Sequence, residues 1–113
     1  MAKQQDAVLR DRRPNPVYID SCVDDMGLSS GAFRVYCHLI RRAGRDGCAF
    51  PSHQSIGNVC FGADSQSANW RVRLSIKAIK ELLARGMIAR KRRARKSTLY
   101  EITPQEEWID LHE

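Results

Sequence analysis

The fold is decided by residues 75–88, which read SIKAIKELLARGMI. Before Gly86 the apolar residues recur at helical spacing, and a glycine is typical of the position just after a helix end. Met87 and Ile88 then begin an extended apolar segment. The sequence therefore predicts a helix over residues 70–85 that turns directly into a β-strand. The expected buried residues of this helix are Val72, Ile76, Ile79, Leu82 and Leu83.

Downstream of the glycine, the pattern is that of a β-hairpin. Residues 98–102, TLYEI, are rich in β-forming side chains and predict a second strand. Between the two strands, residues 90–96 read RKRRARK, so six of these seven positions carry a cation. We expect a hairpin over residues 88–102 whose tip is strongly positive.

Two shorter helices are predicted upstream. The serine pair at residues 29–30 favours the start of a helix over about residues 30–43, which Gly44 ends. Ser52 is the expected cap of a second helix over about residues 53–60. The residues expected to be buried are Phe33, Tyr36, Cys37, Leu39 and Ile40 in the first helix, and Ile56, Val59 and Cys60 in the second.

The segments around the second helix are short or irregular. Residues 48–50, CAF, predict only a stub of strand, because Pro51 cannot continue a ladder of hydrogen bonds. Residues 61–69, FGADSQSAN, are small and polar, which predicts a loop. Gly57 inside the second helix costs about 1 kcal/mol relative to alanine, so packing must hold that helix in place.

Three regions are expected along the chain. Residues 1–16, MAKQQDAVLRDRRPNP, indicate a flexible basic arm, residues 17–103 a single domain, and residues 104–113 an acidic tail. The tail contains Trp108 and either packs back on the core or contacts a partner. The polar start is not followed by the apolar segment of a signal peptide, and no apolar run approaches the ~18 residues of a membrane span. We expect a cytoplasmic protein that does not enter the membrane.

Positive charge is concentrated in one part of the chain. The formal net charge is +6, yet residues 70–97 contain eleven basic residues and only one acidic residue, Glu81. The rest of the chain has eight basic and twelve acidic residues. A merely solvated surface normally intersperses both signs, whereas such a concentration is typical of a surface that binds a polyanion.

The cysteines indicate neither a metal site nor a disulfide framework. The four cysteines form no C-x-x-C pair, and the three histidines have no zinc-ligand spacing. Cys37 and Cys60 stand among apolar neighbours and are expected to be small buried side chains. We therefore expect no metal and no cofactor.

The order of these elements and several local strings resemble the winged helix-turn-helix domains of plasmid and phage replication initiators, replisome organisers and related bacterial regulators. The resemblance covers residues 17–103 and implies an α+β fold, a small winged helix-turn-helix with three core helices plus a C-terminal β-hairpin wing. The chain differs from the family in having about nine residues between the second and third helices, where a few are usual. The matching strings are FRVYCHL (33–39), FPSHQSI (50–56), SIKAIKEL (75–82), RGMI (85–88) and LYEI (99–102).

The resemblance implies binding to double-stranded DNA. The helix over residues 70–85 would enter the major groove, about 12 Å wide, and the wing over residues 88–102 would lie on the backbone or in the minor groove. The start of the second helix would contact a phosphate, and the loop at residues 64–67 is a further candidate contact. Trp70 is expected to seal the start of the third helix rather than to stack on bases. The residues expected to contact DNA are Ser52, His53, Gln54, Asn69, Arg71, Arg73, Lys77, Lys80, Arg90, Lys91, Arg92, Arg93, Arg95 and Lys96.

Two functions without catalysis follow. The first is a DNA-binding protein, either a transcriptional regulator or the DNA-recognition module of plasmid or phage replication or maintenance. The alternative is an interaction adaptor that binds an acidic protein partner; a homodimer or protein contact through the arm or tail is a further expectation. No enzymatic activity is expected, because the scattered aspartates form no paired-carboxylate motif and no phosphate loop or nucleophile elbow is present. RNA binding is less favoured, since no aromatic-rich sheet face is predicted.

Overall fold

The third helix and the strand after it form around a glycine that no other residue replaces without strain. In the computed structural model, residues 19–44, 47–49, 51–63, 66–92 and 98–109 are described. Helix α3 spans Ala68–Ala84 and strand β2 spans Ile88–Lys91. Gly86 between them has φ +69°, and a Cβ atom there would lie 2.5 Å from the backbone oxygen of Glu107. The predicted turn from helix into strand is confirmed.

Helix α3 begins two residues earlier than predicted. Its N-terminal cap is Ser67, whose hydroxyl accepts a hydrogen bond from the backbone N–H of Trp70 at 3.3 Å. The segment between the second and third helices is therefore residues 61–67, shorter than the predicted loop. The candidate DNA contacts at residues 64–65 lie outside the described residues.

The two upstream helices have the predicted bounds and caps. Helix α1 spans Ser30–Ala43, and the Ser29 hydroxyl accepts from the Ala32 N–H at 3.2 Å. Helix α2 spans His53–Cys60, and the hydroxyl of its cap, Ser52, accepts from the third residue of the helix at 3.1 Å. In both cases a serine in an extended conformation satisfies a backbone donor that the first helical turn leaves unpaired.

The buried faces of these helices differ from the predicted stripes, because small residues occupy part of each buried face. Ser75 and Ala78 are buried, whereas three residues of the predicted α3 stripe are only partly covered. At Gly57 a Cβ atom would lie 2.8 Å from the Arg71 backbone oxygen, so the two helix backbones approach too closely for any larger residue. The predicted core residues that are instead partly covered are Val72, Ile76, Leu83, Ile40, Cys37 and Cys60, and those that are exposed are Phe33 and Val59.

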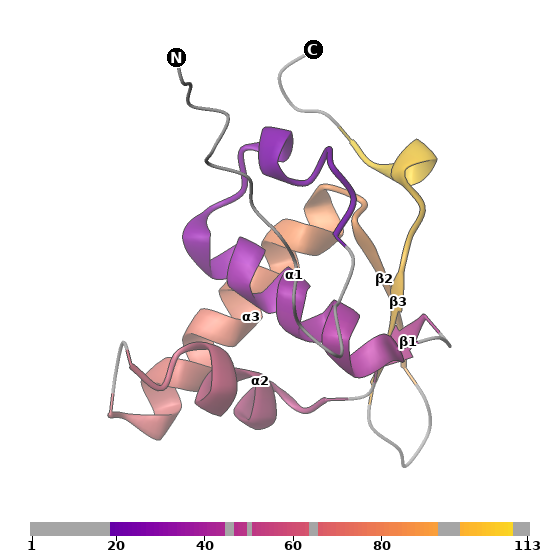
Figure 1. Cartoon of the computed structure of the whole chain (residues 1–113). Coiled ribbons are helices and arrows are strands. Elements are labelled where there is room, and N and C mark those ends of the chain that lie inside the picture. Colours follow the sequence, from indigo (N-terminus) through magenta and orange to yellow (C-terminus); the bar gives the residue numbers. More distant parts are fainter. Residues whose placement is uncertain (1–18, 45–46, 50, 64–65, 93–97, 110–113) are drawn as a thin grey trace, which may run out of the picture.

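The strands form one antiparallel sheet of order β1-β3-β2 on one side of the helices (Figure 1). Strand β1 is the predicted stub, Cys48–Ala49, and it pairs with β3, Leu99–Ile102. In the β2–β3 hairpin, Ile88 pairs with Ile102 and Lys91 with Leu99. The stub therefore widens the wing to three strands and joins it to the segment that precedes α2.

The core lies between the three helices and this sheet. Val35, Leu39, Ile56, Ile79 and Leu82 from the helices meet Met87, Ile88 and Tyr100 from the wing. Three helices followed by a hairpin make a small α+β fold of the winged-helix type, as the sequence predicts. Among the helices of the described residues, none combines the length and the apolar character that a membrane crossing needs.

The segment after the wing packs back on the core. A 3-10 turn at Gln105–Glu107 leads to Trp108, whose indole meets the Tyr36 ring edge to face with ring centres 6.3 Å apart. The indole N–H donates to the Thr103 backbone oxygen at 3.2 Å. The sequence left open whether this tail packs on the core or contacts a partner. Its described part, up to Ile109, packs on the core.

Candidate nucleic-acid interface

One face of α3 is lined by exposed polar and cationic side chains. Asn69, Arg73, Lys77 and Lys80 are all exposed, and their spacing of three or four residues places them on the same side of the helix. The opposite side is the buried one, where Ser75, Ala78, Ile79 and Leu82 face the core. The packing of α3 therefore fixes which of its cations reach solvent.

Arg71 does not belong to this exposed face. In a helix of 3.6 residues per turn, a residue two positions before Arg73 points to about the opposite side. The Arg71 side chain is partly buried, and its Nε–H donates to the Asn58 side-chain oxygen at 3.1 Å. The structure therefore places Arg71 at the crossing of α2 and α3, apart from the other predicted contacts of this helix.

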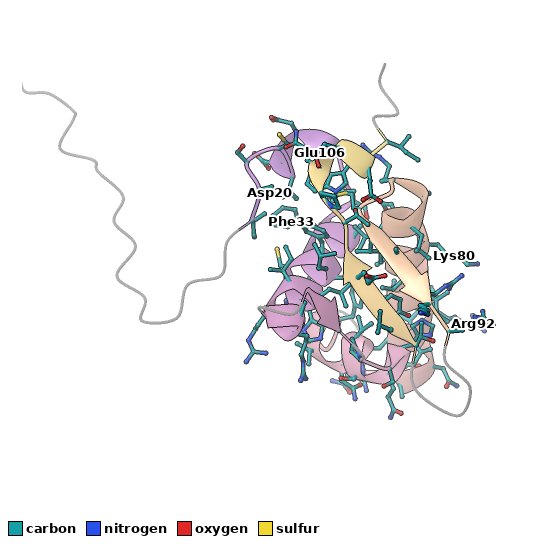
Figure 2. The ribbon with its side chains drawn as sticks, turned by 90° about the vertical axis from the view of Figure 1, so that its right-hand side faces the viewer. Asp20, Phe33, Lys80, Arg92 and Glu106 are labelled. Atoms are coloured by element: carbon teal, nitrogen blue, oxygen red, sulfur yellow. The ribbon has the colours of Figure 1, made fainter. Side chains whose placement is uncertain are left out.

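The wing adds three exposed cations. Arg90 and Lys91 belong to β2, and Arg92 follows it directly. Figure 2 shows Lys80 and Arg92 projecting from the same side of the molecule, whereas Asp20 and Glu106 lie away from that edge. The remaining predicted wing contacts are Arg93, Arg95 and Lys96, which lie outside the described residues.

Residues 70–97, here called the positive stretch, contain a cation that is not at the surface. Arg85 is only 5% exposed, and its guanidinium donates to the backbone oxygens of Met26 and Ile109. It thereby holds the turn before α1 and the backbone at Ile109 against the C-terminus of α3. Exposed cations also occur outside the positive stretch: α1 carries Arg34, Arg41 and Arg42 at the surface.

The start of α2 is fixed to both α3 and the wing through His53. The Ser75 hydroxyl, which donates to the Val72 backbone oxygen at 2.7 Å, also lies 3.1 Å from the backbone oxygen of His53. The His53 Nε2 atom lies 3.3 Å from the hydroxyl of Tyr100 in β3. Burial and then the positive charge of Arg90 lower the pKa of His53, so its neutral form is favoured in this junction.

The other predicted contacts at the start of α2 remain at the surface. Ser52 and Gln54 are exposed, whereas His53 is partly buried by its contact with the wing. The Ser52 oxygen already caps the helix, but both residues are exposed and both side chains still carry hydrogen-bond donors. Two of these three residues are thus placed for contact with a ligand.

Glu81, the single acidic residue of the positive stretch, is directed to α1. Its carboxylate oxygens accept from the Ser29 backbone N–H at 2.8 Å and from the Ser29 hydroxyl at 2.7 Å. A carboxylate at this position also interacts favourably with the positive end of the α1 dipole. This contact joins residues 52 positions apart. Helical spacing within α3 gives no sign of it, so sequence reasoning missed it.

Trp70 does not seal the start of α3 as expected. Trp70 is 49% exposed, and it lines a cavity of about 630 Å³ between the start of α1 and residues 70–78 of α3. The early helix start explains the difference, because Ser67 provides the cap and Trp70 lies in the first turn. The indole is therefore available for contact with another molecule.

Within the described residues, no group of three or more histidine, cysteine or acidic side chains is arranged to hold a metal ion. Cys22, Cys37 and Cys60 are free thiols and are partly buried. Burial raises the pKa of both Cys37 and Cys60, which keeps them as neutral thiols. Comparison of the chain with protein-family models, curated proteins and solved structures gives no match.

Proposed function

We propose that this chain is a non-enzymatic protein that binds double-stranded DNA, with α3 in the major groove and the β2–β3 wing on the backbone or in the adjacent minor groove. The observation that carries the proposal is the shared orientation of the cations. Lys80 of α3 and Arg92 of the wing project from one side of the molecule (Figure 2), and Arg73 and Lys77 are exposed on the same face of α3 as Lys80.

The dimensions of α3 suit reading of base edges. From Arg73 to Lys80 the helix rises about 10 Å at 1.5 Å per residue, which is about three base-pair steps of B-form DNA. The arginine fork can donate two parallel hydrogen bonds to the O6 and N7 atoms of guanine. Asn69, in the first turn, can make the corresponding paired contact with adenine.

The wing and the start of α2 would supply contacts to the phosphates. Arg90, Lys91 and Arg92 are exposed, and within the described residues none of the three forms an ion pair. Ser52 and Gln54 can donate hydrogen bonds to a phosphate at the positive end of α2. Contacts of this kind fix the register of a protein on DNA but do not read its sequence.

The resemblance to winged helix-turn-helix domains supports the same reading and suggests two biological roles. One is a transcriptional regulator, and the other is the DNA-recognition module of a plasmid or phage replication or maintenance system. Both roles place the protein in the cytoplasm. Selection of bound fragments from a randomised DNA library would separate specific from general binding, and palindromic sites would indicate a dimer.

The test is a titration of a labelled duplex by fluorescence anisotropy at several salt concentrations. If the six described cations on α3 and the wing each neutralise one phosphate, affinity should fall by about a thousandfold between 50 and 200 mM salt. Arg73→Ala should lose about 1 to 3 kcal/mol on the preferred sequence and less on others. An affinity that does not change with salt would exclude the proposal.

A further inference from the structure

We propose that the cavity beside Trp70 is a docking site for a short acidic segment of a partner protein that also carries a large apolar side chain. The cavity, here called the Trp70 groove, borders the exposed face of α3 and shares Lys77 with it, but the proposed occupant is a protein segment and not DNA. Its lining comes from the start of α1, the end of α2 with the residue that follows it, and residues 70–78 of α3. The residues of the groove used below are Gly31, Arg34, Phe61, Trp70, Leu74 and Lys77.

The interior of the groove is apolar and preformed. Phe61 is 5% exposed, and its ring lies so close to α1 that a Cβ atom at Gly31 would be 3.2 Å from it. Leu74 continues this surface on α3, and the half-exposed indole of Trp70 forms the rim. An exposed tryptophan beside a concave apolar surface is the kind of feature that dominates the energy of protein interfaces.

The charges around the groove select the occupant. Arg34 and Lys77 line it and both side chains are exposed, and among the residues that the structure describes no acidic one lines it. Arg34 donates only to the backbone oxygen of Val59, at 3.3 Å, and neither cation has an acidic partner in the part of the chain that the structure describes. Two cations over an apolar interior complement a segment that combines carboxylates with an apolar anchor.

The neighbourhood of the groove already binds one carboxylate. Glu81 is held by the N–H and hydroxyl of Ser29 at the positive end of α1, and Ser29 belongs to the groove lining. An incoming carboxylate therefore pairs with Arg34 or Lys77, not with Ser29. The basic arm of the chain itself is excluded as occupant by its sign, since it carries Arg10, Arg12 and Arg13.

The experiment measures binding of a fluorescein-labelled synthetic peptide, Asp-Asp-Leu-Phe-Asp-Leu-Asp-Asp, to the full chain by anisotropy. Trp70→Ala and Arg34→Glu should each weaken binding by about tenfold or more, because one removes the apolar rim and the other places a like charge against the peptide. Arg34→Lys should retain most of the affinity. A peptide in which serines replace Leu and Phe should bind at least about tenfold more weakly.

The matched control is Arg41→Glu. Arg41 is exposed, lies two turns along the same side of α1, and changes the net charge by the same amount without lining the groove. Its peptide affinity should stay within about twofold of the unmodified chain. Equal weakening by Arg34→Glu and Arg41→Glu, or equal binding of the serine peptide, would show general charge attraction and overturn the proposal. Circular dichroism establishes that each variant is folded.

DNA binding is measured on the same variants, so that the two proposals fail separately. Trp70→Ala should bind duplex DNA as the unmodified chain does. If it weakens duplex binding and leaves peptide binding unchanged, the groove belongs to the DNA interface and the docking proposal is wrong. Loss of all DNA binding with peptide binding retained would refute the proposed function and support the groove.

Discussion

At the scale of single residues, the fold depends on glycines at which another backbone segment lies too close for a side chain. Gly57 allows α2 and α3 to cross, and Gly86 allows α3 to end and the wing to begin. A sequence pattern indicates that a glycine is present but not which backbone comes close to it. A glycine inside a helix lowers the stability of that helix, but at position 57 the Arg71 backbone lies too close for a larger residue, so the packing of α2 on α3 requires it.

Gly86→Ala tests whether the close backbone contact at the end of α3 requires a glycine. The substitution forces an alanine into a left-handed conformation and brings its Cβ against the Glu107 backbone, so we expect a loss of about 2 kcal/mol or more of unfolding free energy. Urea denaturation followed by circular dichroism measures it. Gly47→Ala is the control, because its φ of +73° is similar and nothing lies within 4 Å of the new atom. Similar losses at both positions would contradict the role of the close backbone contact.

A second prediction concerns His38, which is 3% exposed and whose Nε2 atom has no partner among the described residues. Burial, and then the charges of Arg42, Arg34 and Arg41, lower its pKa. The unfolded chain therefore binds a proton near pH 6.5 while the folded chain does not. Stability is lost as the pH falls below about 6.5.

His38→Leu should keep the volume of the side chain and remove this term. The unfolding free energy of the variant should fall less than that of the unmodified chain between pH 7 and pH 5. Urea denaturation at each pH provides the comparison, and the carboxylates common to both chains cancel in the difference. Parallel curves for the two proteins would mean that His38 takes up its proton in the folded state.

At the scale of elements, local signals predicted well and long-range contacts could not be predicted. The bounds of α1 and α2 follow from serine caps and helical spacing, which act within a few residues. The predicted start of α3 was two residues too late, because Ser67 in the polar segment before it serves as the helix cap. Arg71 and Trp70 were misplaced for a related reason, since the apolar pattern near the start of α3 allows more than one buried face.

The link between α3 and α1 gives an element-scale prediction. Glu81→Ala removes both acceptors of Ser29 and leaves the first turn of α1 less well satisfied, so we expect a loss of about 1 kcal/mol of unfolding free energy. Glu106→Ala removes an exposed acidic residue whose side chain makes no hydrogen bond or ion pair with the described residues, and it should change stability by less than about 0.5 kcal/mol. Thermal unfolding distinguishes them, and equal midpoints would rule out a capping role for Glu81.

At the scale of the whole molecule, the charge distribution is less one-sided than the sequence indicates. The count of basic residues in the positive stretch predicts a strongly positive surface. However, Arg85 is buried in the fold, and Arg71 is bound to Asn58 at the crossing of α2 and α3. Conversely, α1 brings exposed arginines from outside that stretch. What the sequence could not provide is the direction in which each cation points, because that depends on how α3 packs.

Direction, unlike net charge, separates two variants that remove one positive charge each. Arg92→Ala removes a cation on the side where Lys80 projects (Figure 2). Arg42→Ala removes a cation from the last turn of α1, a different element. If the duplex lies across α3 and the wing, Arg92→Ala should reduce the slope of log affinity against log salt by about 0.9, the value for one lost phosphate contact. Arg42→Ala should leave that slope unchanged within error, and its affinity should shift only through screened long-range attraction. Anisotropy titrations at four salt concentrations measure both slopes. Identical slopes for the two variants would show that the protein attracts DNA by its overall charge and presents no oriented surface to it.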